Sequence, residues 1–241
     1  MGFFDLLNPW LTRADLFMVD ALSPAVRLVV WGVVGAIVSM GLYWLFSPQA
    51  MIADLKVRIK RSRRALDAHE GEMKDALPLM GQSLALALKQ VVVILVPGVV
   101  SAVPLLFLLA WLYTGYGYRL PASYGDIPLR AVPARFHAHW KVGAGMTPPE
   151  IVVDGRGSKR VAEIAIKAPI PYVAKRQWWN ALFGNRNGYL PGNGRLEYIE
   201  VGLPRKTYLP FGPGWARGWE AIFFAVLIVV SIIMKFAFRI D

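Results

Sequence analysis

Three long runs of apolar residues, separated by polar segments, dominate the pattern along the chain. They cover Leu28–Phe46, Val91–Tyr113 and Ala221–Met234. The first two reach the roughly 18–20 residues with which a helix crosses a hydrocarbon core about 30 Å thick. The third reaches that length if Trp219 and Glu220 lie at one interface and the Lys235 ammonium group extends to the other. A buried helix of a soluble protein is the alternative for this third run. The pattern predicts transmembrane helices at residues 25–47 and 90–114, and a third with a short tail at 217–241.

Residues 48–89 form a polar segment with a helical repeat. Its core-type positions alternate in steps of three and four residues, at Ile52, Leu55, Ile59, Ser62, Leu66, His69 and Met73. This spacing is typical of a coiled-coil seam. The segment is therefore predicted to be a coiled coil, either as one long helix or as a hairpin folded near Gly71.

Residues 115–216 change to short alternating runs separated by glycine and proline. The runs are Arg135–Val142, Ile151–Asp154, Val161–Lys167 and Leu196–Leu203. Such a pattern predicts a small antiparallel β domain, with one helical turn around residues 177–183. The large apolar side chains in this turn are either domain core or a surface that rests on the membrane or on another subunit; they are Trp178, Trp179, Leu182 and Phe183.

Residues 1–24 mix apolar and charged side chains. An amphipathic segment in the lipid headgroup layer explains this mixture, and a loop packed on neighbouring subunits is the alternative.

Charge predicts the orientation. Hydrophobic residues make up 56% of the chain and charged residues 18%, with a formal net charge of +11. Six basic residues are concentrated after the first apolar run, at Lys56, Arg58, Lys60, Arg61, Arg63 and Arg64. Because basic short loops stay in the cytoplasm, the chain is predicted to be a multi-pass protein of the cell inner membrane, with an outer N-terminus, an extracytoplasmic β domain and a cytoplasmic C-terminus. These basic residues follow the first apolar run, whereas the basic residues of a cleaved signal peptide precede its apolar core. We therefore do not expect the first run to be a cleaved signal peptide. Anionic lipid headgroups account for the positive charge, so no nucleic-acid partner is expected.

Candidate chemistry is sparse. The chain has no cysteine, which excludes disulfides and thiolate chemistry. His137 and His139 lie on one face of a predicted strand and form a weak metal site, with Asp126 or Glu150 as possible third ligands. The alternative is a pair of surface histidines. No nucleophile triad or phosphate-binding loop is evident, so we expect neither an enzyme nor a cofactor.

The spans differ in character. Gly32, Gly35, Ala36 and Ser39 give the first span small residues four apart, which favours close packing of another helix. Pro97 and Pro104 are expected to kink the second span. No acidic residue lies at mid-depth, which argues against proton-coupled transport.

The order of elements is distinctive: an outer N-terminus, a span, a basic cytoplasmic coiled coil and two further spans. Over Leu28–Phe46, Lys56–Met73 and Met80–Trp111, ending in Tyr118-Arg119-Leu120-Pro121, this order resembles the YidC/Oxa superfamily of membrane-protein insertases. It is most similar to the small three-span branch of archaeal and endoplasmic-reticulum proteins. The β domain falls where that branch has a short connection.

The resemblance implies a half-open bundle with a polar groove towards the cytoplasm and a coiled coil that meets the client or the ribosome. Groove candidates are then Arg27, Ser39, Gln90 and Ser101, and the run Lys56–Arg64 is a surface for docking to lipid or a partner.

The fold class expected is thus a membrane all-α core, made of three transmembrane helices plus a cytoplasmic coiled coil, with an inserted small extracytoplasmic β domain. Two functions follow. The first is an insertase-like or chaperone-like protein that assists the insertion or assembly of client membrane proteins. The second is a non-catalytic accessory or scaffold subunit of a larger membrane protein complex.

Overall fold

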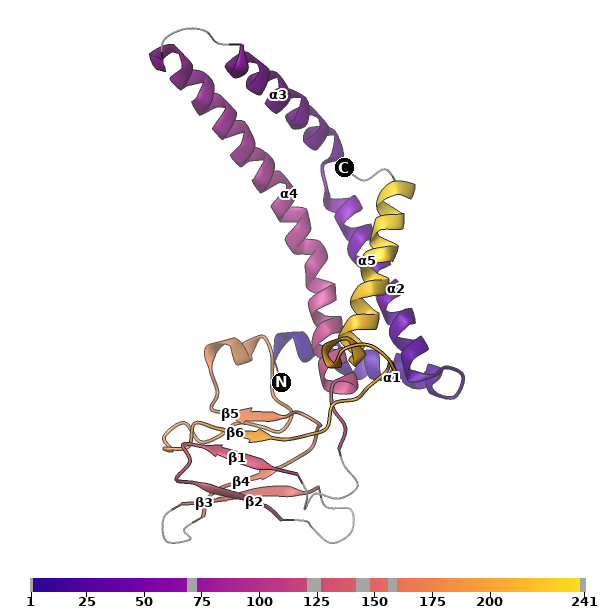
Figure 1. Ribbon diagram of the computed structural model, residues 1–241, viewed down its shortest axis with the longest axis vertical. Helices are drawn as coiled ribbons and strands as arrows, with labels where there is room; N and C mark the ends of the chain where they lie inside the picture. The colour runs from indigo at the N-terminus through magenta and orange to yellow at the C-terminus, as the bar shows by residue number, and fades with distance from the viewer. Residues whose placement is uncertain (1, 69–72, 121–126, 142–147, 156–159, 239–241) are drawn as a thin grey trace. The chain divides into compact units, whose positions relative to one another are not determined.

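The computed structural model describes residues 2–68, 73–120, 127–141, 148–155 and 160–238, and it divides the chain into two compact units. Unit 1 contains residues 1–28 and 106–223, and unit 2 contains residues 29–105 and 224–241. Three of the described helices are long and apolar enough to cross a membrane, namely α2 (Pro24–Phe46), the Leu77–Tyr116 part of α4 (Met73–Tyr116) and α5 (Trp219–Ala237). The prediction of a helical core with three apolar helices and a small β region is confirmed (Figure 1).

In unit 2 the polar segment is a pair of helices. Helix α3 (Gln49–Asp67) ends before α4 begins at Met73, so the segment is a hairpin rather than one long helix. The seam positions Ile52, Leu55, Ile59 and Ser62 are buried. The hydroxyl oxygens of Ser62 and Ser83 lie 2.6 Å apart and join the two helices. The seam position His69 and the predicted fold point Gly71 lie outside the described residues, as does the side chain of Met73.

Helix α4 continues through its prolines. Pro78, Pro97 and Pro104 all lie inside one helix, although each removes a backbone hydrogen-bond donor. In the turn before Pro104, the Ser39 hydroxyl donates to the carbonyl of Ser101 at 3.1 Å. Neighbouring side chains of this kind allow a membrane helix to tolerate proline.

The β domain lies in unit 1 and consists of two antiparallel sheets of three strands each. One sheet has the order β1-β6-β5, with β1 at Leu129–Val132, β6 at Tyr198–Val201 and β5 at Tyr172–Ala174. The other has the order β2-β3-β4, with β2 at His137–Lys141, β3 at Glu150–Asp154 and β4 at Arg160–Ala165. The four predicted runs correspond to β2, β3, β4 and β6.

One hydrophobic core joins the two sheets. Ile199 and Val201 alternate inward on β6 and are 0% and 1% exposed. They belong to the same buried cluster as Val173 of β5 and Ile151 and Val153 of β3. The period of two places Ile199 and Val201 on one face of β6, whereas on β3 the intervening Val152 is buried as well.

The N-terminal residues pack on the rest of unit 1. The 3₁₀ turn η1 (Phe3–Asp5) is followed by α1 (Asn8–Val19). The Phe4 ring stacks on Phe183 at a centroid distance of 4.9 Å and meets Phe107 edge-on at 5.1 Å. The Asp5 carboxylate accepts hydrogen bonds from the backbone N–H groups of Gly2 (2.8 Å) and Gly184 (2.9 Å). These contacts attach the first residues to the β domain and to the end of α4.

The predicted helical turn is η3 (Trp178–Ala181), and a further turn, η4 (Gly214–Arg217), precedes α5. Trp178 is 78% exposed, and Trp179, Leu182 and Phe183 are also exposed. The alternative that this cluster forms the domain core is therefore wrong. Trp219, in contrast, is buried and packs on Phe223.

Candidate functional site

Unit 1 contains a cleft of about 820 Å³ between α1, the first turn of α2, the last turns of α4 and the chain before η4. Unit 1 thereby brings together the start of α2, the end of α4 and the start of α5. Alternating spans place these three ends on the same side of a membrane. The cleft is thus built where apolar helices meet a polar domain.

An ion pair forms one wall of the cleft. Arg27 Nη1 lies 2.5 Å from Asp15 Oδ2, and both side chains are only 13% exposed. The Tyr116 hydroxyl donates to the other oxygen of Asp15, also at 2.5 Å, and the Arg27 guanidinium lies over the Tyr116 ring. A cation in the first turn of a helix opposes the helix dipole, so Asp15 compensates both that dipole and the loss of hydration.

Hydrogen bonds fix the other walls. Trp111 Nε1 donates to the Thr12 hydroxyl at 2.9 Å and holds α1 against α4. Lys206 Nζ donates to the Gly115 carbonyl at 2.6 Å, and the Tyr208 hydroxyl donates to the Tyr116 carbonyl at 2.9 Å. Carbonyl groups at a helix C-terminus lack partners within the helix, so these two side chains cap α4 and bring the chain before η4 to the cleft.

The cleft is strongly basic. Among the described residues that line it, one side chain is acidic, Asp15, and five are basic: Arg27, Arg119, Arg186, Arg205 and Lys206. Burial, and then the nearby positive charge of Arg27, lowers the pKa of Lys206 below its usual range. Basic groups collected in a concave surface raise the local concentration of anions.

The Nε atom of Arg27 is buried and has no hydrogen-bond partner among the described residues. A carboxylate or phosphate that enters the cleft could therefore meet both exposed cations and a free donor. Guanidinium groups bind such anions through paired hydrogen bonds. The arrangement can hold an anionic group, and it offers no assembled nucleophile and base among the described lining residues.

Sequence reasoning found one of these residues, Arg27. It missed Asp15, Arg119, Arg186, Arg205 and Lys206, which come from four separate segments. Part of the signal was present, because Arg119 lies six residues after the end of the second apolar run, and Arg205 and Lys206 lie before the third. The position of Arg186 beside them depends on the fold of the β domain.

The other groove candidates lie in unit 2. Ser39 donates to the Ser101 carbonyl, and the Ser101 hydroxyl donates to the Gly98 carbonyl at 2.9 Å. Gln90 is half-buried. The two serines are thus brought together, with their hydroxyl protons used in bonds to backbone carbonyls.

The small residues of the first span are mostly buried. Gly32, Gly35 and Ala36 are buried and Ser39 is half-buried. The hydrogen bond from Ser39 shows that this face of α2 contacts α4 within unit 2.

The six basic residues of α3 are all exposed, namely Lys56, Arg58, Lys60, Arg61, Arg63 and Arg64. Arg58 Nε lies 2.8 Å from the Asp54 carboxylate, four residues earlier. The buried seam of α3 lies on one side of the helix, and the basic residues lie outside this seam. Helix α3 therefore presents an exposed basic face.

The histidine pair lies on the exposed side of β2. His139 Nδ1 is 3.5 Å from the Asp154 carboxylate, and Glu150 contacts Lys141 instead. Within the described ranges, no group of three or more potential metal ligands is assembled. Asp126 lies outside the described residues.

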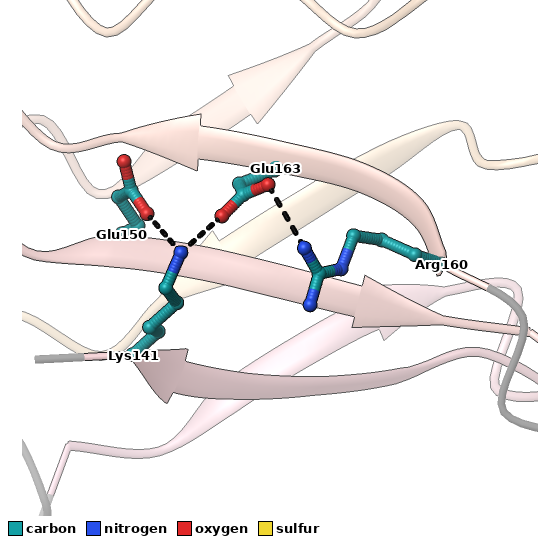
Figure 2. A network of polar contacts seen from close by, with 4 residues as sticks. All are labelled: Lys141, Glu150, Arg160 and Glu163. Atoms are coloured by element: carbon teal, nitrogen blue, oxygen red, sulfur yellow. Dashed lines mark hydrogen bonds and ion pairs between the residues drawn. The ribbon is translucent and has the colours of Figure 1, made fainter.

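A polar network covers the same sheet, as Figure 2 shows. Lys141 Nζ bridges Glu150 (2.9 Å) and Glu163 (2.6 Å), and Arg160 contacts Glu163 at 3.2 Å. The hydrogen bond from Lys141 lowers the pKa of the Glu163 carboxyl, and the hydrogen bond to Glu163 raises the pKa of the Lys141 ammonium group. The network is exposed and joins all three strands β2, β3 and β4, and ion pairs with this exposure contribute little to stability.

Comparisons of the chain with protein-family models, with curated protein sequences and with solved structures find no match.

Proposed function

We propose that the chain is an insertase-like or chaperone-like protein of the cell inner membrane, which assists the insertion or assembly of other membrane proteins. The observation that carries the proposal is the basic cleft of unit 1, built at the ends of the apolar helices. The order of elements, which resembles the YidC/Oxa superfamily, supports it, but in the orientation proposed here the cleft opens on the outer side, whereas the groove that the resemblance implies opens towards the cytoplasm. In this proposal the N-terminus and β domain are extracytoplasmic, and the C-terminus is cytoplasmic.

The physical problem for such a protein is the polar end of a client. Carboxylates in the hydrocarbon region are costly unless they are paired or hydrated. A cleft with five basic side chains at the edge of the membrane offers paired, hydrated surroundings to an acidic client segment. We therefore assign the cleft to acidic segments of client proteins.

The hairpin of α3 and α4 has a role in the same proposal. Its six exposed basic residues suit anionic lipid headgroups or the acidic surface of a client or a ribosome. Here we retain the coiled-coil interpretation of the hairpin, because its buried positions follow the spacing of three and four residues.

A second function is favoured by a different observation. The hydroxyl groups of Ser39 and Ser101 are bound to backbone carbonyls and do not form a polar path within the spans. Only 6% of the most apolar stretch of α5 is buried within the chain, which leaves a large surface for neighbouring helices. These features suit an accessory or scaffold subunit of a larger membrane complex.

Depletion of the protein tests both proposals. For an insertase, we expect several unrelated clients with short acidic tails to lose insertion, and expression of the Arg205→Glu/Lys206→Glu double variant should fail to restore it. The Arg195→Glu variant is the matched control, because Arg195 is exposed on the β domain and outside the cleft. If a single complex disappears and this chain purifies with it in a fixed ratio, the scaffold function is correct and the insertase function is wrong.

A further inference from the structure

Exposed aromatic side chains gather around the ends of the apolar helices in unit 1. We define this aromatic belt as Trp10 and Phe17 on α1, Trp178 on η3 and Trp215 on η4; their exposed fractions are 67%, 88%, 78% and 78%. Large apolar side chains with such exposure are costly in water. We propose that the aromatic belt is immersed in the lipid headgroup layer and docks unit 1, including the β domain, on the membrane surface. This inference does not depend on the proposed function of the cleft.

The contacts of α1 place it beside a membrane span. Thr12 is hydrogen-bonded to Trp111, and Asp15 to Tyr116. Both partners lie in the last two turns of the apolar helix Leu77–Tyr116. Helix α1 is therefore at the depth where that span leaves the hydrocarbon.

The two faces of α1 have different surroundings. At 100° per residue, Trp10 and Phe17 lie within about 20° of each other, and Thr12 and Asp15 lie on the opposite side. The second pair lines the cleft, so the first pair points away from it. Arg13 lies over the Trp10 ring at 5.5 Å, and a basic residue beside an aromatic one is typical of helices that lie in the headgroup layer.

The turn η3 is attached through η1 to the part of α4 that belongs to unit 1. Phe183, just after η3, stacks on Phe4, and Phe4 contacts Phe107 of α4. The Phe4 N–H also donates to the Leu182 carbonyl at 2.9 Å. Trp178 thus projects from a part of the β domain that is fixed to the span by an aromatic stack. Figure 1 shows η1 and α1 beside the end of α4 that belongs to unit 1.

Trp215 lies next to the third span, because η4 ends at Arg217 and α5 begins at Trp219. Three separate segments therefore present tryptophan at the ends of membrane helices. Tryptophan is enriched at this depth because its ring is apolar and its N–H remains hydrated. A lipid surface fits these observations better than a protein partner does, since the belt is continuous with the spans.

The absence of cysteine from the chain allows a direct test. Single-cysteine variants Phe17→Cys, Trp178→Cys and Trp215→Cys of the full chain would carry a nitroxide label in vesicles of zwitterionic and anionic phospholipid. The matched control is Arg195→Cys, exposed on the β domain and outside the belt. Power-saturation electron paramagnetic resonance then measures collisions with oxygen, which is concentrated in lipid, and with a polar nickel complex, which is excluded from it.

We expect the three belt labels to favour oxygen over the nickel complex, compared with the control label. Belt labels that collide with the nickel complex as often as the control label does would overturn the proposal. Labels shielded from both reagents would also overturn it, because they would indicate a second copy of the chain as the occupant. The three positions are exposed, so labelling does not remove a core contact, and each one is an independent test.

Discussion

The pair of Arg27 and Asp15 allows the cleft to be tested quantitatively. Asp15→Asn keeps the shape of the side chain and its ability to accept the hydrogen bond from Tyr116, but removes the negative charge. Arg27 would then remain 13% exposed and would lose the carboxylate with which it pairs. Breaking a buried ion pair by removing one partner costs about 3–5 kcal/mol. Because the cleft admits some water, we expect a loss near the lower end, about 3 kcal/mol in the free energy of unfolding.

The assay is unfolding of the purified full chain in mixed micelles by titration with a denaturing detergent, followed by near-ultraviolet circular dichroism. The Arg27→Gln variant and the double variant complete a thermodynamic cycle. Since the two side chains touch, the double variant should be more stable than the sum of the single losses predicts, by about 1–3 kcal/mol. An Asp15→Asn protein within about 0.5 kcal/mol of the wild type, or strictly additive losses, would refute the pairing.

Three further predictions concern the β domain, the hairpin and the pH dependence. Ile199→Ala should destabilise the β domain by about 2–5 kcal/mol in a thermal unfolding scan, because Ile199 is fully buried; the exposed neighbour Glu200→Ala should stay within about 0.5 kcal/mol, and equal losses would contradict the assigned faces of β6. Ser62→Ala or Ser83→Ala alone should cost about 1 kcal/mol by leaving one hydroxyl without its partner, while the double variant should cost less than the sum; a strictly additive cycle would argue against their 2.6 Å contact. A lysine is charged below its pKa, and the pKa of Lys206 is lowered from 10.5; binding of an acidic peptide, measured by fluorescence anisotropy, should therefore weaken as pH rises towards 10.5, and the Lys206→Met variant should lack this step.

The helices were the most predictable part of the fold, because membrane thickness sets a minimum length of apolar sequence. The seam of α3 was also evident, since Ile52, Leu55 and Ile59 recur at the spacing of one helix face. The second span was predicted with Pro97 and Pro104 inside it, and the described helix α4 continues through both of them.

The β domain was predicted in part. Strand β3 has a run of buried residues and β6 alternates between buried and exposed ones, but β1 and β5 have only four and three residues and too little alternation to be recognised. The exposure of Trp178 could not be derived either, because an aromatic side chain in a turn gives no periodicity that separates core from surface.

The cleft was the least predictable feature. Its ion pair joins residues 15 and 27, and its basic side chains come from positions between 27 and 206. Their convergence depends on the docking of α1 against α4 through Trp111. A local pattern cannot contain that information, because the contact joins residues 12 and 111.

The most direct test of the proposed function is insertion into vesicles that contain only lipid and the purified chain. A single-span client with a short acidic outer tail would be synthesised in their presence, and the fraction of its tail protected from added protease would be measured. We expect protection to rise with the wild-type chain and with Arg195→Glu, and to return to the level of empty vesicles with the Arg205→Glu/Lys206→Glu variant. Equal protection in empty and wild-type vesicles, or an undiminished effect of the double variant, would contradict the assignment of the basic cleft to client insertion.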